Sequence, residues 1–337
     1  MKVFEIQGEF GFENLRLVER PDPTPGPGQV LVKMKGVSLN FRDILMVRGH
    51  YNPRQPLPLI PCSDGVGEIV AVGEGVDWVS TGDRVAGIFS QTWIGGPPSP
   101  EKLGGTLGGP LDGTLAELMV LDAQGVVKVP GHLSDAGAST LPCAAVTAWS
   151  ALVEEGEVRS GDTVLVQGTG GVSIFALQFA RLLGARVIAT SSSHEKLEKV
   201  RDLGAWATIN YQEDPQWGKT ARKLTGGVGV DHIVEVGGAG TLEQSLRAVR
   251  TGGTVSVIGV LSGTSAKINI IPLLMQQIRL QGLLVGSREA FERMNRAISL
   301  HELRPVIDRV FAFDETPDAF GHMASGAHVG KVCISFN

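Results

Sequence analysis

Cysteine, runs of basic residues and long apolar runs are all scarce in this chain of 337 residues. It has three cysteines, Cys62, Cys143 and Cys333, and no two of them have CxxC spacing. An odd number of scattered thiols argues against a disulfide framework and a zinc ribbon, and it indicates the cytoplasm. No run of lysine or arginine could follow a phosphate backbone, so nucleic acid is not an expected partner. No apolar run approaches the ~20 residues that span a bilayer, and no secretory signal is recognised, so no membrane partner is expected either.

Glycine, by contrast, is abundant: 45 residues, or about double the usual share of roughly 7%. The glycines have no G-x-y period, which indicates many tight turns and not a fibre. The length favours two domains on a soft prior of ~100–200 residues each. Up to about residue 127, short extended segments alternate with Gly/Pro-rich turns, a pattern typical of a β-rich, barrel-like domain. These segments are 1–7, 14–21, 29–37, 66–73 and 83–88.

From about residue 160 the pattern becomes alternating strand and helix, which predicts a parallel sheet with right-handed crossovers. The expected strands are 163–167, 186–190, 207–210, 231–236, 254–259 and 279–286. Ser192 with Glu195, and Thr241 with Gln244, have the spacing of a capping box at a helix start. Gly184 and Gly204 lie where helices are expected to end, and residues 330–336 are expected to form a closing strand. The Gly/Pro-rich segment 94–113 is long for a connection and is a candidate lid.

The sequence GTGGVS, residues 168–173, follows the first of these six strands. The strand–glycine–helix context supports a dinucleotide-binding turn in which Gly168 allows the tight turn and Gly170 lets a pyrophosphate approach the backbone. The helix that begins near Gly171 and Val172 would offer its free N–H groups to the anion. The alternative is a glycine-rich turn with no ligand.

The end of the second strand bears on which dinucleotide is bound. An acidic residue there would bind the ribose diol of NAD, whereas this chain has Ser191, Ser192 and, further on, Lys196. Hydroxyls and a lysine suit a 2′-phosphate and favour NADP(H) over NAD(H). The alternative is that the serines only cap the helix.

Five segments together resemble the medium-chain dehydrogenase/reductase superfamily, in particular its zinc-independent, quinone-oxidoreductase-like and zinc-type alcohol dehydrogenase-like branch. They are 36–43, 58–76, 141–152, 168–173 and 250–259. The resemblance implies an α/β fold in which a Rossmann doubly wound parallel sheet is inserted into a GroES-like β-rich catalytic domain. Residues 1–127 and 289–337 would form the catalytic domain, and 128–288 the NADP(H)-binding domain.

The resemblance also implies cofactor contacts, most of them at the carboxyl ends of the parallel strands, where ligands bind in such folds. Thr147 would face the nicotinamide, and Tyr211 would lie near the adenine ribose. The remaining positions, by the adenosine or the nicotinamide, are Val236, Gly237, Ile258, Gly259 and Val285.

Zinc-dependent relatives hold catalytic zinc with a Cys, a His followed by Glu, and a second Cys. In this chain these positions fall near Asn40 (or at Ser38), at Ser63 followed by Asp64, and at Cys143. Because only Cys143 is a usual zinc ligand, no zinc is expected, although Asp43, Asp64 and Cys143 could form an unorthodox site. Without a Lewis acid to make an alcohol acidic, hydride transfer to an electron-poor acceptor is favoured.

Candidate catalytic residues are few. Tyr51 is at a position where some zinc-free relatives contact substrate, and it could donate a hydrogen bond to the acceptor; alternatively, it covers the site as a loop residue. Asn40 is expected to face the nicotinamide or to fix its own loop. Arg42 and Asp43 are expected to pair at a helix start, and Cys143 is interpreted as a small buried residue.

The sequence therefore predicts an enzyme: an NADPH-dependent, metal-free oxidoreductase that transfers hydride to a quinone or an α,β-unsaturated carbonyl. One alternative is an NAD(P)-dependent alcohol dehydrogenase with a degenerate zinc site, and another is a non-catalytic NADPH-binding protein. The resemblance further implies a small-molecule substrate and a homodimer joined through the sixth strand, 279–286.

Overall fold

The computed structural model describes residues 1–336, and the chain divides into two compact units. Unit 2 is Thr147–Val285, and unit 1 combines Met1–Val146 with the chain from Gly286 onward. The sequence analysis placed the boundaries at 128 and 288. Residues 128–146 belong to unit 1 because α3 (Asp135–Ser139) packs on two strands of that unit, β3 and β4.

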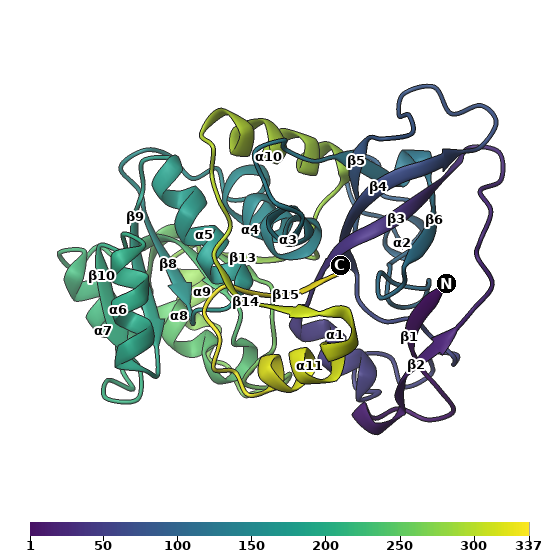
Figure 1. Ribbon diagram of the computed structural model, residues 1–337. Coiled ribbons are helices and arrows are strands. Elements are labelled where there is room, and N and C mark those ends of the chain that lie inside the picture. Colours follow the sequence, from purple (N-terminus) through teal and green to yellow (C-terminus); the bar gives the residue numbers. More distant parts are fainter. Residues whose placement is uncertain (337) are drawn as a thin grey trace. The chain divides into compact units, whose positions relative to one another are not determined.

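Unit 2 contains a six-stranded parallel sheet with the strand order β10-β9-β8-β11-β12-β13. Strands β8, β9, β10 and β13 of this sheet are labelled in Figure 1. The chain starts at the centre with β8, moves outward to β10, and returns to β11 on the other side, which is the doubly wound arrangement predicted from the sequence. The strands are β8 (Thr163–Gln167), β9 (Arg186–Ser191), β10 (Ala207–Asn210), β11 (Val230–Glu235), β12 (Val249–Val257) and β13 (Arg279–Gly282). The helices are α4 (Val146–Trp149, which begins at the unit boundary), α5 (Gly171–Leu182), α6 (His194–Asp202), α7 (Trp217–Leu224), α8 (Leu242–Ala248) and α9 (Ile271–Met275).

Burial explains why these segments form these elements. All five residues of β8 are buried, as expected for a central strand covered on both faces. Apolar residues of α7 and α8, among them Trp217 and Leu246, pack against β-strand residues such as Ile233 in one core. Gly184 and Gly204 have positive φ angles just after α5 and α6, so the predicted helix ends are confirmed.

Unit 1 is built around a seven-stranded sheet with the path β14-β15-β3-β4-β5-β7, in which β6 also pairs with β3. A separate hairpin pairs β1 with β2. The strands are β1 (Lys2–Ile6), β2 (Leu15–Glu19), β3 (Gln29–Ser38), β4 (Asp64–Val72), β5 (Arg84–Gly87), β6 (Leu118–Asp122), β7 (Val126–Lys128), β14 (Ile307–Ala312) and β15 (Lys331–Ser335). The helices are α1 (Phe41–Val47), α2 (Pro100–Leu103), α3, α10 (Arg288–Leu300) and α11 (Thr316–Ala324).

The strands expected from the first half of the sequence are all present, but β6, β7 and β14 were not predicted. They lie in segments of mixed polarity, and they are strands because they pair with β3, β5 and β15, respectively. Within residues 1–336, none of the helices combines the length and the apolar character that crossing a membrane requires.

Candidate active site

The chain leaves β3 at Ser38 and enters α1 through Asn40, which is the N-cap of this helix. The backbone N–H of Asn40 donates to Oδ2 of Asp43 at 2.7 Å, and both side chains are buried. A carboxylate in the first turn also suits the positive end of the helix dipole. Asp43 thus closes the helix start, while the side-chain oxygen of Asn40 is left for a different partner.

That partner is Lys331, the first residue of β15. Its Nζ donates to Oδ1 of Asn40 at 2.6 Å and to the backbone oxygen of Leu39 at 2.7 Å, and the side chain is only 3% exposed. β3 lies between β15 and β4, and Ser38 is in register with Asp64 of β4. The sheet therefore brings Lys331 within 4.0 Å of Oδ2 of Asp64, although the two residues are far apart in the sequence.

Asp64 is fully buried and accepts two further hydrogen bonds. Ser63 Oγ donates to Oδ1 at 2.8 Å, and the backbone N–H of Cys143 donates to Oδ2 at 3.1 Å. Burial raises the pKa of Asp64 above its ordinary value, and the nearby Lys331 ammonium opposes this shift. We refer to Asn40, Ser63, Asp64, Cys143 and Lys331 as the buried polar cluster.

Burial also raises the pKa values of two neighbouring groups. Burial raises the pKa of Asp43 to about 6, against the opposing charge of Arg42. Burial also raises the pKa of the Cys143 thiol, and the Asp64 carboxylate raises it further. A thiol that resists ionisation is a poor nucleophile, as the sequence analysis expected, but Cys143 is half-buried and not the fully buried residue that was predicted.

Tyr51 lies in the loop after α1 and is 43% exposed. Its backbone N–H donates to the oxygen of Leu45 at 3.1 Å, which fixes the loop to the end of the helix. Its ring lies over the guanidinium group of Arg42, with 4.9 Å between Cζ and the ring centroid. Asn40 and Tyr51 thus come from the two ends of one short segment of unit 1.

The predicted dinucleotide turn joins β8 to α5 in unit 2. Gly168 has φ of 70°, a conformation that favours glycine, and a Cβ on Gly168 or Gly170 would meet no atom within 4 Å. Gly170 is the N-cap of α5, and no side chain caps the first turn, which contains Gly171 and Val172. Open space over uncapped N–H groups fits the pyrophosphate of a dinucleotide.

The end of β9 has the predicted serines, with one correction. Ser191 ends the strand and is buried, while Ser192 is exposed. The N-cap of α6 is Ser193 and not Ser192, because the helix begins one residue later than expected. The Oγ of Ser193 accepts a hydrogen bond from the backbone N–H of Lys196 at 3.4 Å. Ser192 therefore does not cap the helix, which was the alternative that the sequence analysis gave for it.

Tyr211 lies beside this strand end, because its backbone N–H donates to the oxygen of Ser191 at 3.1 Å. Its ring is partly exposed. The predicted residues Ser191, Ser192, Lys196 and Tyr211 thus gather at the adjacent carboxyl ends of β9 and β10.

A buried carboxylate that the sequence analysis did not identify organises the end of β11. Glu235 accepts hydrogen bonds from Gln167 Nε2 at 2.7 Å and from the N–H groups of Gly237 and Gly238 at 2.9 Å each. Thr241 Oγ1 also donates to Glu235 and makes no side-chain cap of α8, so the capping box expected at Thr241 is wrong.

Glu235 therefore connects the end of β8 to the turn that contains the predicted residues Val236 and Gly237. The next predicted pair, Ile258 and Gly259, follows β12 directly. The N–H of Ile258 donates to the backbone oxygen of Glu235 at 2.8 Å.

The two remaining predicted contacts lie at the ends of unit 2. Thr147 belongs to α4 and is buried. Val285 is also buried and has φ of 50°, which is unusual for a β-branched residue. In unit 2 the predicted residues thus lie at the carboxyl ends of five strands, β8 to β12, and at the two ends of the unit, while Asn40 and Tyr51 lie in unit 1.

Two family models match the chain in the order of its units. The Alcohol dehydrogenase GroES-like domain matches residues 26–131, and Zinc-binding dehydrogenase matches residues 171–300. A zinc-type alcohol dehydrogenase-like protein of Schizosaccharomyces pombe is 43% identical over 97% of this chain and 96% of its own. The chain belongs to the medium-chain dehydrogenase/reductase superfamily. The resemblance found in the sequence is confirmed.

Relatives within the superfamily are named for two chemistries. An acryloyl-coenzyme A reductase of Metallosphaera sedula is 29% identical over 99% of this chain and 100% of its own. The structure of an NAD-dependent alcohol dehydrogenase superposes with a TM-score of 0.91 at 32% identity, covering 100% of both chains. Crotonyl-CoA carboxylase/reductase AntE in complex with NADP superposes with a TM-score of 0.89 at 26% identity, covering 99% of this chain and 94% of its own. This superfamily member is therefore an oxidoreductase enzyme.

Zinc-dependent relatives hold catalytic zinc at three positions, which in this chain are Asn40 (or Ser38), Ser63 and Cys143. Within residues 1–336 no three His, Cys, Asp or Glu side chains are grouped so that they could hold a metal ion. Asp64 is already bonded to Ser63 and to the Cys143 backbone, and Lys331 places an ammonium group beside it. Three residues of which one is a thiol, with a cation next to them, do not fit catalytic zinc.

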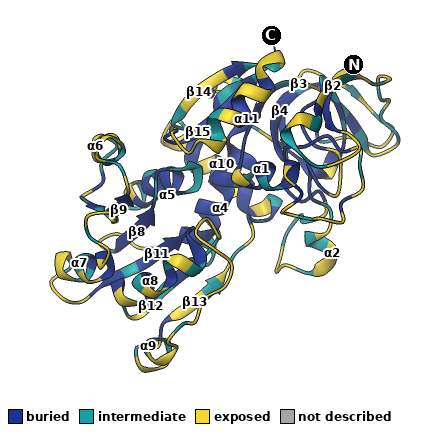
Figure 2. Cartoon of the chain, turned by 90° about the horizontal axis from the view of Figure 1, so that it is seen from below, coloured by how far each residue is buried: buried dark blue, intermediate teal, exposed yellow. Residues whose placement is uncertain are grey.

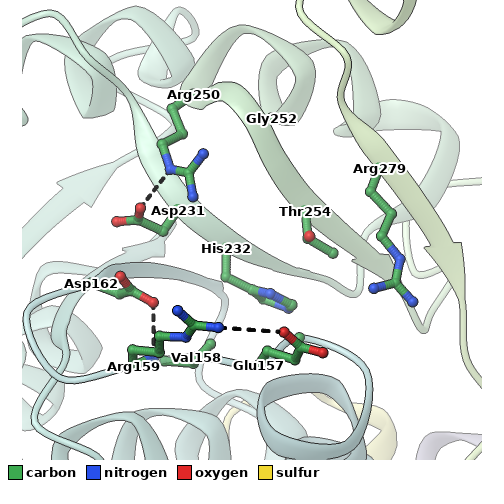
Figure 3. Close-up of a pocket in the computed structure, with 11 residues that line it drawn as sticks. Glu157, Val158, Arg159, Asp162, Asp231, His232, Arg250, Gly252, Thr254 and Arg279 are labelled. Atoms are coloured by element: carbon green, nitrogen blue, oxygen red, sulfur yellow. Dashed lines mark hydrogen bonds and ion pairs between the residues drawn. The ribbon is translucent and has the colours of Figure 1, made fainter.

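A cavity of about 470 Å³ lies at the opposite, amino-terminal end of the unit 2 sheet (Figure 3). Three arginines line it, but each is paired with a carboxylate: Arg159 with Glu157, Arg250 with Asp231, and Arg279 with Glu155. Because the charges balance, the cavity has no evident preference for an anion. The dinucleotide turn and the strand ends described above are at the other end of the strands.

The residues that sequence reasoning missed share one property. Lys331 and Glu235 are charged groups that burial places next to partners distant in the chain. The signal available for Lys331 was a lysine at the start of an apolar strand, and for Glu235 an acidic residue at the end of one. Neither signal indicates which residues from other parts of the chain contact Lys331 or Glu235.

Proposed function

We propose that this oxidoreductase uses NADPH to reduce an activated double bond, in a quinone or an α,β-unsaturated carbonyl, without a metal ion. The observation that carries the proposal is the buried polar cluster, where Lys331 lies 4.0 Å from Asp64 and where, of the three positions that hold zinc in zinc-dependent relatives, only Cys143 has a usual zinc ligand. Oxidation of an alcohol requires the loss of its hydroxyl proton, and without a Lewis acid no metal lowers the pKa of that hydroxyl. When a conjugated acceptor receives hydride, the negative charge moves to its carbonyl oxygen, where a hydrogen-bond donor can stabilise it. The acryloyl- and crotonyl-CoA reductases among the relatives support this class of acceptor.

The residues of unit 2 account for the preference for NADPH. The uncapped first turn of α5 would hold the pyrophosphate, and Ser191, Ser192 and Lys196 would hold the 2′-phosphate. The NADP bound to the crotonyl-CoA reductase relative supports this choice, while the NAD-dependent alcohol dehydrogenase shows that the superfamily also uses NAD. When bound, NADPH supplies the hydride.

Two residues of unit 1 would stabilise the negative charge that develops on the acceptor oxygen and donate the proton that completes the reduction. Among the described residues, 1–336, Nδ2 of the buried Asn40 side chain has no hydrogen-bond partner, while Lys331 fixes the oxygen of the same amide. Asn40 would donate Nδ2–H to the oxygen on which negative charge develops. Tyr51, whose side chain is partly exposed, would give its hydroxyl proton to the reduced acceptor and recover one from water.

The test is NADPH oxidation followed by absorbance, with chelator-treated protein and a simple enone, an ortho-quinone or an enoyl thioester as acceptor. Turnover that survives the chelator and prefers NADPH to NADH is the expected result. Turnover of an alcohol with NAD⁺ that the chelator abolishes and zinc restores would contradict the proposal and establish the zinc-dependent alternative.

We also propose a homodimer through the free edge of β13, in the cytoplasm. β13 is the last strand of the sheet, and apolar side chains are exposed along it and α9 (Figure 2). They are Ile270, Ile271, Leu274, Met275, Leu280 and Leu284. A second copy of this edge would cover such a patch, and a cytoplasmic location agrees with three free cysteines.

A further inference from the structure

We infer that Arg42 is a positioning residue for Tyr51: it holds the tyrosine ring in place and lends positive charge to the phenolate that proton donation creates. This inference rests on the proposed function, in which Tyr51 gives a proton to the reduced acceptor. Sequence reasoning assigned Arg42 only a pairing with Asp43 at the start of α1.

The guanidinium group of Arg42 contacts two aromatic rings. Its Cζ lies 4.9 Å from the ring centroid of Tyr51 and 4.8 Å from that of Phe89. Arg42 is only 8% exposed, and Phe89 is buried, so both contacts are largely removed from water. Cation–π contacts are stronger when they are desolvated. The partly exposed Tyr51 ring is therefore held against a fixed, buried surface.

Hydrogen bonds fix the guanidinium group itself. Nη1 donates to the backbone oxygen of Leu107 at 2.8 Å, and Nη2 donates to that of Gly109 at 3.3 Å. Both acceptors belong to the Gly/Pro-rich segment that the sequence suggested as a lid. Arg42 thus ties this segment to the Tyr51 loop, and the planar fork that makes two such bonds is specific to arginine.

The charge of Arg42 is only partly neutralised. Oδ1 of Asp43 lies 3.7 Å from Nη1. In the part of the chain that the structure describes, this oxygen accepts no hydrogen bond and Nε of Arg42 has no hydrogen-bond partner. Burial lowers the pKa of Arg42, but the Asp43 carboxylate and the Tyr51 phenol raise it above its ordinary value. The guanidinium therefore stays charged and retains attraction for a second anion.

The chemical consequence concerns the proton-transfer step. After hydride has reached the β-carbon of an enone, the O–H bond of Tyr51 breaks, and the electron pair of the enolate forms the new C–H bond at the α-carbon. The electron pair of the O–H bond stays on the phenolate oxygen, beside the Arg42 cation. Because Tyr51 is 43% exposed, water then returns a proton to it.

The contact can be tested without turnover, because the chain has only two tyrosines, Tyr51 and Tyr211. Protein labelled with 3-fluorotyrosine should give two ¹⁹F resonances, and Y51F identifies the one from Tyr51. In R42M and in R42K the Tyr51 resonance should move toward the position of free fluorotyrosine and sharpen, while the Tyr211 resonance stays. The matched control is R48M, since Arg48 caps the same helix and lies 5.0 Å over a different ring, that of Phe12.

Activity then tests the catalytic meaning of the contact. We expect Y51F to lower kcat for an enone by ~100-fold or more, the usual contribution of a general acid. R42K should lower kcat by roughly 2- to 30-fold, which is what a cation–π contact is worth, and leave KM for NADPH unchanged. In the Y51F background R42K should cause no further loss, because the group through which Arg42 acts is absent. R42K keeps the charge, so it remains available if R42M does not fold.

Different outcomes overturn different statements. An unmoved Tyr51 resonance in folded R42K or R42M overturns the positioning role. Losses in R42K and Y51F that multiply in the double variant overturn the action of Arg42 through Tyr51. A wild-type enzyme that oxidises no NADPH with any acceptor contradicts the proposed function, and in that case the fluorine experiment still decides whether Arg42 positions Tyr51.

Discussion

Lys331 and Asp64 form a buried charge pair across β3, with 4.0 Å between Nζ and Oδ2. The two side chains are 3% and 0% exposed. Removing one partner of such a pair leaves the other charge buried and uncompensated, which is more costly than the pair itself. K331M should therefore lower the free energy of unfolding by about 3–5 kcal/mol, measured by denaturant titration at neutral pH.

Two controls separate this effect from a general loss of packing. The double variant K331M/D64N should lose less than the sum of the single variants, because the uncompensated charge is removed. K128M, which breaks the more exposed pair of Lys128 with Asp83, should change stability by about 1 kcal/mol or less. Additive losses in the double variant would show that Lys331 and Asp64 act independently.

Ser192 offers a test of cofactor choice, because it is exposed at the end of β9 and does not cap α6. S192D places a carboxylate where the proposal puts the 2′-phosphate. We expect KM for NADPH to rise about 10-fold or more through repulsion between like charges, while KM for NADH changes little. Steady-state kinetics with both cofactors measures the ratio.

The neighbouring Ser193 supplies the matched control. S193A removes the N-cap of α6 and should cost about 1 kcal/mol of stability without changing the ratio of the two KM values. If S192D raises both KM values equally, the serines do not contact the 2′-phosphate.

Local patterns in the sequence were sufficient to predict the turn between β8 and α5 and the strand ends beside it. Gly168 follows an apolar strand and precedes an apolar helix, and the order of strand and helix alone fixes which ends of the strands meet. A superfamily resemblance then placed Val236 and Ile258 at neighbouring strand ends.

The buried polar cluster could not be predicted in the same way, because it depends on pairing across the whole chain. Lys331 and Asn40 are 291 residues apart, and Arg42 and Leu107 are 65 apart. No local period indicates such contacts. The misplaced cap at Ser192 has a smaller cause: consecutive serines offer equivalent caps, and packing of Leu197 and Val200 selects where α6 begins.

Leu274 and Met275 test the proposed dimer, since they are 77% and 72% exposed on α9 beside the edge strand. If a second copy covers them, L274E/M275E should be monomeric where the wild type is dimeric, because burying two carboxylates in an apolar interface is unfavourable. Light scattering coupled to size-exclusion chromatography gives the masses. L300E is the control, because Leu300 is 79% exposed on α10 of unit 1. A monomeric wild type, or an L300E variant that also dissociates, would contradict the assignment.

His232 makes folding depend on pH in a definite window. His232 lines the cavity at the amino-terminal end of the unit 2 sheet (Figure 3) and is 1% exposed. Its Nε2 lies 3.1 Å from Ser256 Oγ. The pKa of His232 is lowered from 6.5 to about 4, mainly by burial and also by the charge of Arg279, and Asp231 opposes both. Between these two values the unfolded chain binds a proton that the folded chain does not. The contribution of the neutral His232 to the free energy of unfolding is therefore fully present above about pH 6.5, and it decreases as the pH falls toward 4.

The expected size follows from the shift: about 3 kcal/mol of unfolding free energy lost between the two pH values, at ~1.4 kcal/mol per pKa unit. H232Q is uncharged at every pH and can still bond to Ser256, so its stability should fall less over the same window. The cavity carboxylates Asp162 and Glu157 are present in both proteins, so the difference between wild type and H232Q isolates His232. H301Q, at an exposed histidine after α10, should follow the wild-type curve. Parallel curves for wild type and H232Q would mean that His232 is protonated as readily in the folded chain as in the unfolded one.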